Sequence, residues 1–249
     1  MPQESISSEN NVPEKLHFSE VEQLREPVKK ILAQIAPCLE KGEYQLLIGD
    51  DASGRVPTWI MRKIIGEIYQ EKGFPPIETV YIAGSGSSAK NANIMEEEGQ
   101  EKKEKIGDFI NYLRKGKESQ KMRLHAPLSR VLIVTDTVYT GTSLDPLTEV
   151  LKENGIPFDV AAIGLEKTHS GDKGYRFGQK IIYGQEEIPS IDGASHLSGV
   201  GKYTRQLFAH PRNRVFASKD VQKTTVELSR EDASRLAKEI IEKYRQERV

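Results

Sequence analysis

Five short apolar runs, separated by stretches of helical periodicity, constrain the fold of this chain most strongly. The runs cover residues 44–49, 78–84, 131–134, 158–165 and 179–184. Apolar strands that alternate with helices form parallel βαβ units, whose helices cover both faces of the sheet. The sequence therefore predicts an α/β fold, with a Rossmann-like parallel sheet of about five strands flanked by helices.

The composition gives no overall argument for a nucleic-acid or membrane partner, although a local basic patch is left open. The chain has 36 Lys and Arg against 37 Asp and Glu, so its net charge is -1. No segment approaches the roughly 18 apolar residues that a membrane helix needs. Cys38 is the only cysteine, which excludes an internal disulfide and fits a reducing compartment. We expect a cytoplasmic, soluble protein that binds small molecules, and a homodimer is left open.

The chain is expected to form a short tail and one domain. Residues 1–15 are polar and predict a disordered N-terminal tail, whereas residues 16–249 predict a single domain. Ser229 and Asp232 are predicted to cap the last helix. Its apolar stripe, which we expect to pack against the domain, is Ala233, Leu236, Ala237, Ile240, Ile241 and Tyr244.

A ligand site is expected where the strands end. In an open parallel sheet, ligands bind outside the carboxyl ends of the strands, near helix N-termini with outward-pointing amides. Thr140, Gly141, Thr142 and Ser143 follow the third run and precede a helix. Their amides and hydroxyls would hold a phosphate, and Asp136 would accept hydrogen bonds from sugar hydroxyls. The alternative is an ordinary turn with a helix cap.

The segment VLIVTDTVYTGTS, residues 131–143, resembles the signature of the type I phosphoribosyltransferases. In that family an acid pair holds the ribose hydroxyls of phosphoribosyl pyrophosphate, and the following loop holds its 5-phosphate. Here Thr135 stands at the first acid position, and only the second acid is retained. Tyr139 stands where purine salvage members carry an Asp, which argues against a 6-oxopurine acceptor. The resemblance implies a substrate-binding segment of Asp136, Thr137, Tyr139, Thr140, Gly141, Thr142 and Ser143.

The loop after the first run fits the same resemblance. In the family this loop contacts pyrophosphate, which implies roles for Ser53, for the amides around Gly54, and for Arg55 as a cationic clamp on the leaving group. Asp50 and Asp51 would bind Mg²⁺ directly or through water, or would hold the arginine in position. The alternative is an ordinary turn with a surface salt bridge.

The other segments have less specific counterparts in the family. Lys90, in the loop after the second run, would reach a phosphate. Residues 91–128 fall where the family keeps a mobile flap, although they are richer in helix than such a flap. The family builds its acceptor pocket from a variable hood of terminal segments, which implies a core of 44–184 with a hood from 16–43 and 185–249.

The resemblance thus implies a Mg²⁺-dependent enzyme that transfers ribose 5-phosphate from phosphoribosyl pyrophosphate to a nucleobase or related acceptor and releases pyrophosphate. Asp136 and Arg55 would be its catalytic residues, because a carboxylate near the ribose stabilises an oxocarbenium-like state. The alternative is a non-catalytic sensor of phosphoribosyl pyrophosphate or a nucleotide, with Thr135 marking lost chemistry. A phosphatase of the haloacid dehalogenase type is disfavoured, because Val138 stands where that chemistry needs a second acid.

Overall fold

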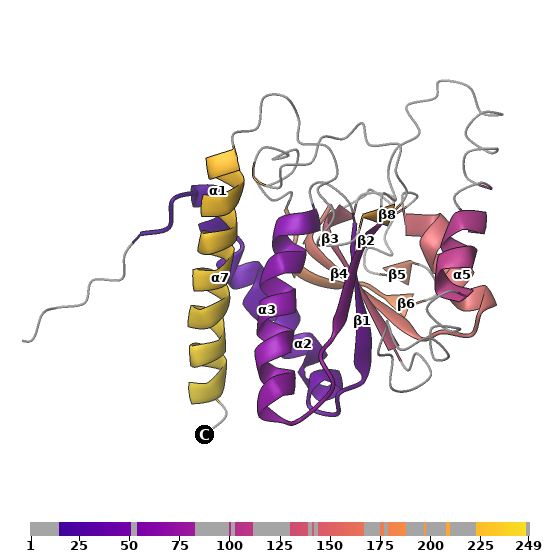
Figure 1. Ribbon diagram of the computed structural model, residues 1–249, viewed down its shortest axis with the longest axis horizontal. Coiled ribbons are helices and arrows are strands. Elements are labelled where there is room, and N and C mark those ends of the chain that lie inside the picture. Colours follow the sequence, from indigo (N-terminus) through magenta and orange to yellow (C-terminus); the bar gives the residue numbers. More distant parts are fainter. Residues whose placement is uncertain are drawn as a thin grey trace, which may run out of the picture.

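The protein is built around a mostly parallel sheet (Figure 1). In the computed structural model, the described residues are 15–50, 54–82, 100, 103–111, 130–138, 141, 144–166, 175–176, 179–187, 197, 208–209 and 223–247. Within these ranges the sheet has six strands in the order β7-β4-β3-β1-β2-β8. They are β1 (Tyr44–Asp50), β2 (Glu78–Ile82), β3 (Arg130–Val138), β4 (Phe158–Leu165), β7 (Ile182–Gln185) and β8 (Phe208–Ala209). All neighbouring pairs are parallel except β2 with β8, which pairs antiparallel at the edge.

Helices cover both faces of this sheet. The helices are α1 (Ser19–Glu22), α2 (Arg25–Leu39), α3 (Arg55–Glu71), α5 (Asp145–Glu153) and α7 (Lys223–Gln246). Successive strand residues point to opposite faces, so Leu47 packs in the core with α2, α3 and α7, whereas Ile48 packs in the core with α5 and the helical segment 103–111. Figure 1 shows α3 and α7 side by side on one side of the sheet and α5 on the other. No helix in the described part of the chain is long and apolar enough to cross a membrane.

The predicted fold class is confirmed, with one strand divided. Four of the predicted runs form β1, β2, β3 and β4. The fifth run is split at Ile181: β6 (Gln179–Lys180) pairs antiparallel with β5 (Tyr175–Arg176), and β7 joins the main sheet beside β4. The predicted tail falls almost wholly outside the described residues, and the boundaries of the core and the hood remain predictions.

The predicted cap of the last helix is wrong. α7 begins at Lys223, so Ser229 and Asp232 lie inside the helix rather than at its start. The fully buried Asp232 instead accepts hydrogen bonds from the backbone N–H of Phe18 and from Nδ1 of His17, each at 2.8 Å. An acid inside the last helix therefore fixes the chain just before α1.

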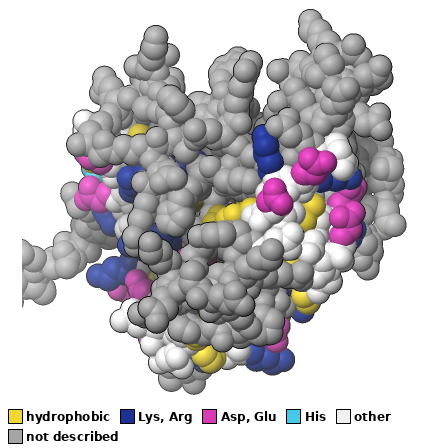
Figure 2. Space-filling model, turned by 45° about the vertical axis from the view of Figure 1, so that its right-hand side comes forward, with side chains coloured by type: hydrophobic (Ala, Val, Ile, Leu, Met, Phe, Trp, Pro, Cys, Tyr) yellow, Lys and Arg dark blue, Asp and Glu magenta, His cyan; other side chains and the backbone are white. Residues whose placement is uncertain are grey.

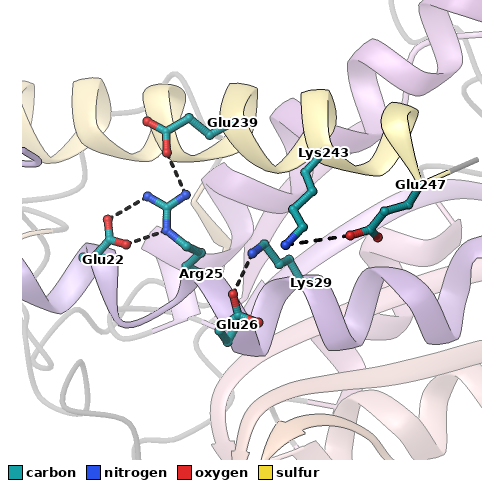
Figure 3. Close-up of polar contacts among 7 residues, drawn as sticks. All are labelled: Glu22, Arg25, Glu26, Lys29, Glu239, Lys243 and Glu247. Carbon is teal, nitrogen blue, oxygen red and sulfur yellow. Dashed lines mark hydrogen bonds and ion pairs between the residues drawn. The ribbon is translucent and has the colours of Figure 1, made fainter. Parts of the chain in front are cut away.

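A polar network also joins α2 to α7 (Figure 3). Arg25 of α2 bonds Glu22 on one side and, at 2.6 Å, Glu239 of α7 on the other. The first segment of the domain is thereby tied to the last, on the face that also carries α3.

The contact between α2 and β7 predicts a steric effect. A Cβ added to Gly184 would lie 2.5 Å from both Cα and Cβ of Pro27, so α2 would have to move away from the sheet. We expect Gly184→Ala to lower the free energy of unfolding by about 1–3 kcal/mol, as overpacked cores do, in urea denaturation. Gly66→Ala on α3 is the control, because nothing lies within 4 Å of its added Cβ. Equal losses in the two variants would contradict the steric explanation.

Candidate functional site

The candidate site lies where β1 and β3 end. The chain runs from β1 to β2 on one side and later returns to β3 on the other side of β1, so the strand order reverses between β1 and β3. Ligands of open parallel sheets bind in the crevice outside the carboxyl ends at such a point. Gly49 pairs with Val134 across these strands, so the next residues, Asp50 and Thr135, lie beside each other at the strand ends.

Two carboxylates meet at the hydroxyl of Thr135. Its Oγ1 lies 3.3 Å from Oδ2 of Asp50 and 3.3 Å from Oδ1 of Asp136. Because both carboxylate oxygens lie at that distance from one atom, they lie no farther apart than twice that distance. The hydroxyl has one proton and donates to one of them at a time. All three side chains are buried, with exposed fractions of 7% for Asp50, 1% for Thr135 and 5% for Asp136. Two neighbouring buried acids favour a cation or a set of hydroxyl donors beside them.

The first turn of α3 begins beside Asp50 and the end of β3. Gly54 is the N-cap of α3, and a Cβ added to it would lie 3.2 Å from the carbonyl oxygen of Val134 and 3.4 Å from Cβ of Asp50. The absent side chain thus allows the helix start to approach the ends of both strands. The N-terminus of a long helix carries a partial positive charge and outward N–H groups, which suit an anion.

Arg55, the first residue of α3, brings a full positive charge to the same edge. Its exposed fraction is 4%, and its guanidinium carbon lies 4.5 Å from the ring centre of Tyr81 at the end of β2. Alternation from Val134, which lies in the core on the α3 side, directs Asp136 to that side as well. The Asp136 carboxylate and the Arg55 guanidinium therefore emerge at the same end of the strands and on the same side of the sheet.

The end of β3 supplies two further features. Thr137 Oγ1 is buried and, among the described residues, has no hydrogen-bond partner. Buried hydroxyls are usually paired, so this one is suited to a ligand group. Gly141 has φ of 76°, in the left-handed region, and its carbonyl accepts the Leu144 N–H at 2.9 Å in the turn that leads to α5. A turn with positive φ at this position favours glycine, which is the residue found there.

The structure brings together part of the predicted site. Six predicted residues lie at the β1/β3 edge or in the segment that leads from it to α5: Asp50, Gly54, Arg55, Asp136, Thr137 and Gly141. Seven lie outside the described residues: Asp51, Ser53, Lys90, Tyr139, Thr140, Thr142 and Ser143.

Sequence reasoning did not assign a contact role to Thr135 and passed over Tyr81 and Gly49. The sequence marks Thr135 only as a position that lacks an acid, whereas its hydroxyl lies within hydrogen-bond distance of both carboxylates. Tyr81 is the only aromatic residue within β2. An aromatic residue one place before the strand end is the available signal for its contact with Arg55 at the start of α3.

One pocket among the described residues lies away from the candidate site, between α2 and α7. It has a volume of about 260 Å³ and is lined only by residues of α2 and α7 and the residue after α7, with Leu32, Ala36 and Ile240 among them. Lys29 and Lys243 at its edge are paired with Glu26 at 2.6 Å and Glu247 at 3.8 Å (Figure 3). It contains no strand-end residue and no group suited to catalysis, so we assign it no part in the site.

Metal ligation by protein side chains alone is not supported in the described ranges. No group of three or more His, Cys, Asp and Glu side chains there is arranged to hold an ion.

Comparison with protein-family models, curated proteins and solved structures found no match to this chain. The argument for a function therefore depends on the chemistry of the β1/β3 edge.

Proposed function

We propose that the chain is a phosphoribosyltransferase that transfers ribose 5-phosphate from phosphoribosyl pyrophosphate to a nucleobase or related acceptor, with release of pyrophosphate. The observation that supports it most is the convergence of Asp50, Thr135 and Asp136 at the ends of β1 and β3, where the start of α3 lies against Asp50 and Thr135. A sugar phosphate needs carboxylates that accept hydrogen bonds from its hydroxyls and amides that bind its phosphate, close to each other. The resemblance of residues 131–143 to the family signature supports the same proposal.

Each residue has a defined role in this proposal. Asp136 accepts hydrogen bonds from the ribose hydroxyls, and its charge stabilises the cationic anomeric carbon while the bond to pyrophosphate breaks and the bond to the acceptor nitrogen forms. Arg55 stabilises the negative charge that accumulates on pyrophosphate. Thr137 and Gly141 belong to the segment that binds the 5-phosphate, and Ser53 and Lys90 are further phosphate ligands.

Asp50 compensates for the missing acid of the signature. Thr135 occupies the first acid position, but its hydroxyl lies 3.3 Å from the Asp50 carboxylate on the neighbouring strand. A second carboxylate is thus supplied across the sheet rather than along the strand. This contact favours the enzyme over a sensor that has lost its chemistry.

Mg²⁺ fits this set of oxygen ligands as an ion shared with the substrate. Mg²⁺ is usually held by one or two carboxylates together with waters and substrate phosphates, rather than by a cage of side chains. Asp50 and Asp136 offer two carboxylates near each other, and Asp51 is a further predicted ligand. When bound, the ion would supply positive charge that neutralises the pyrophosphate.

The proposed partners are small molecules in the cytoplasm. Figure 2 shows acidic and basic side chains interspersed among the described residues of one face, and no broad surface of a single sign is visible among them. Nucleic acids bind mainly through a basic surface, so this distribution gives no support for such a partner. The single cysteine, Cys38, fits a reducing compartment.

Pyrophosphate release tests the proposal. The protein is incubated with phosphoribosyl pyrophosphate, Mg²⁺ and a panel of purine, pyrimidine and other nitrogen acceptors, and released pyrophosphate is measured against an acceptor-free control. Acceptor-dependent release supports the enzyme, with pyrimidines expected before 6-oxopurines because of Tyr139. Calorimetric binding of the donor without release by any acceptor would support the sensor. If the donor does not bind, both functions are excluded.

A further inference from the structure

The Arg55 guanidinium lies over the ring of Tyr81. Tyr81, directly beneath it at 4.5 Å, is fully buried. The half-buried Trp59 of α3 packs against Tyr81, and the guanidinium carbon of Arg230 from α7 lies 4.9 Å from the Trp59 ring centre. The Arg55–Tyr81 contact lies at the candidate site, whereas the Arg230–Trp59 contact lies one side chain farther from it.

Gly49 makes room for the Tyr81 ring. Gly49 and Tyr81 are neighbours in the β1/β2 ladder, and a Cβ on Gly49 would lie 2.6 Å from Cδ1 and 2.7 Å from Cε1 of the ring. The same Cβ would lie 2.7 Å from Oγ1 of Thr58, which donates a 2.6 Å hydrogen bond to the carbonyl of Gly54. The missing side chain thus lets the tyrosine ring and the first turn of α3 occupy fixed positions beside the strand end.

Stacking on a ring suits an arginine that binds an anion. The face of a tyrosine ring is electron-rich and attracts a guanidinium, most strongly where water is excluded. The N–H groups of the guanidinium lie in its own plane, so contact through its face does not use the directions in which it binds phosphate. The ring also restricts a long side chain that would otherwise lose conformational entropy when the ligand binds.

We propose that Tyr81 is a positioning residue, whose ring holds Arg55 for the pyrophosphate of the donor and sets the affinity of the site for that anion. This inference rests on the proposed function, because it takes Arg55 as the pyrophosphate clamp. The aromatic ring is the required feature, and the phenolic hydroxyl is not.

Calorimetric titration with inorganic pyrophosphate and Mg²⁺ tests the inference. Tyr81→Leu is expected to weaken pyrophosphate binding about five- to thirtyfold, the range between a partly exposed and a desolvated cation–π contact, whereas Tyr81→Phe keeps near wild-type affinity. In an Arg55→Ala background, Tyr81→Leu should cause no further loss, because the ring then has no guanidinium to hold. Arg230→Gln is the matched control: it removes the cation–π contact on Trp59 and should leave pyrophosphate affinity unchanged.

A shape-preserving series keeps the test valid if Tyr81→Leu does not fold. Phenylalanine analogues with increasing fluorination at position 81 retain the ring and reduce the electron density of its face. Affinity for pyrophosphate that falls stepwise with fluorination supports the inference. Wild-type binding with no response to fluorination would reject the role of Tyr81 and leave the proposed function intact. Wild-type protein that binds neither pyrophosphate nor phosphoribosyl pyrophosphate would reject both.

Discussion

Asp136→Asn is expected to lower kcat/KM for phosphoribosyl pyrophosphate by about 100-fold or more, the size of effect seen when one electrostatic stabiliser is removed from an active site. Asn has nearly the shape of Asp and still accepts a hydrogen bond from Thr135, so the fold should be kept. It lacks the negative charge that stabilises the anomeric carbon in the proposed reaction. Steady-state kinetics with the best acceptor, together with a urea unfolding curve, would measure both effects.

Asp159→Asn provides the matched control for that experiment. Asp159 is the second residue of β4 and lies at the amino-terminal ends of the strands, whereas the candidate site lies at their carboxyl ends. It accepts hydrogen bonds from Tyr44 at 2.7 Å and Arg130 at 2.9 Å. The same chemical change there should lower stability and leave kcat/KM within about twofold, since distant sites act independently. If Asp136→Asn behaves like this control, Asp136 does not take part in the reaction.

The fold could be predicted because its signal is local. Each main strand contains its own apolar run, and the glycines that follow α3 and α5, Gly73 and Gly155, have the positive φ that helix ends favour. The positions of Asp50 and Asp136 followed from the same signal, because both stand where an apolar run ends. Parallel strands and the positions of their ends are enough to bring these residues to the same end of the sheet.

The contacts within the site could not be predicted, because they depend on register between distant segments. Thr135 reaches Asp50 only because Gly49 pairs with Val134, residues that lie far apart in sequence. The sequence presents Tyr81 as one more apolar residue of a strand, and the position of its ring depends on the absent side chain of Gly49 in the neighbouring strand.

Local spacing also misled at Asp232. Its position near the start of the last apolar stripe suggests a helix cap, whereas α7 begins at Lys223, about two and a half turns before Asp232 at about 3.6 residues per turn. The carboxylate is instead used by His17 and Phe18, more than 200 residues away in sequence. An acidic side chain near a helix start satisfies either a local or a remote donor, and only the tertiary structure decides which.

Gly141→Ala is expected to weaken binding of phosphoribosyl pyrophosphate by about tenfold to 100-fold, because a Cβ there would strain the backbone of the segment proposed to bind the 5-phosphate. Gly141 has φ of 76° between the end of β3 and the start of α5, a conformation that costs other residues about 1–2 kcal/mol. Affinity is measured by calorimetry, and stability by urea denaturation.

Gly155→Ala separates the two effects of that substitution. Gly155 has φ of 63°, follows α5, and has nothing within 4 Å of an added Cβ. Both variants should therefore lose about 1–2 kcal/mol of stability, since the backbone strain is similar. Only Gly141→Ala should also lose donor affinity, because Gly155 follows the C-terminal end of α5, whereas the phosphate is proposed to bind at its N-terminal end. Equal donor affinities in the two variants would show that the segment around Gly141 does not hold the phosphate, and the assignment of the 5-phosphate to residues 140–143 would then be wrong.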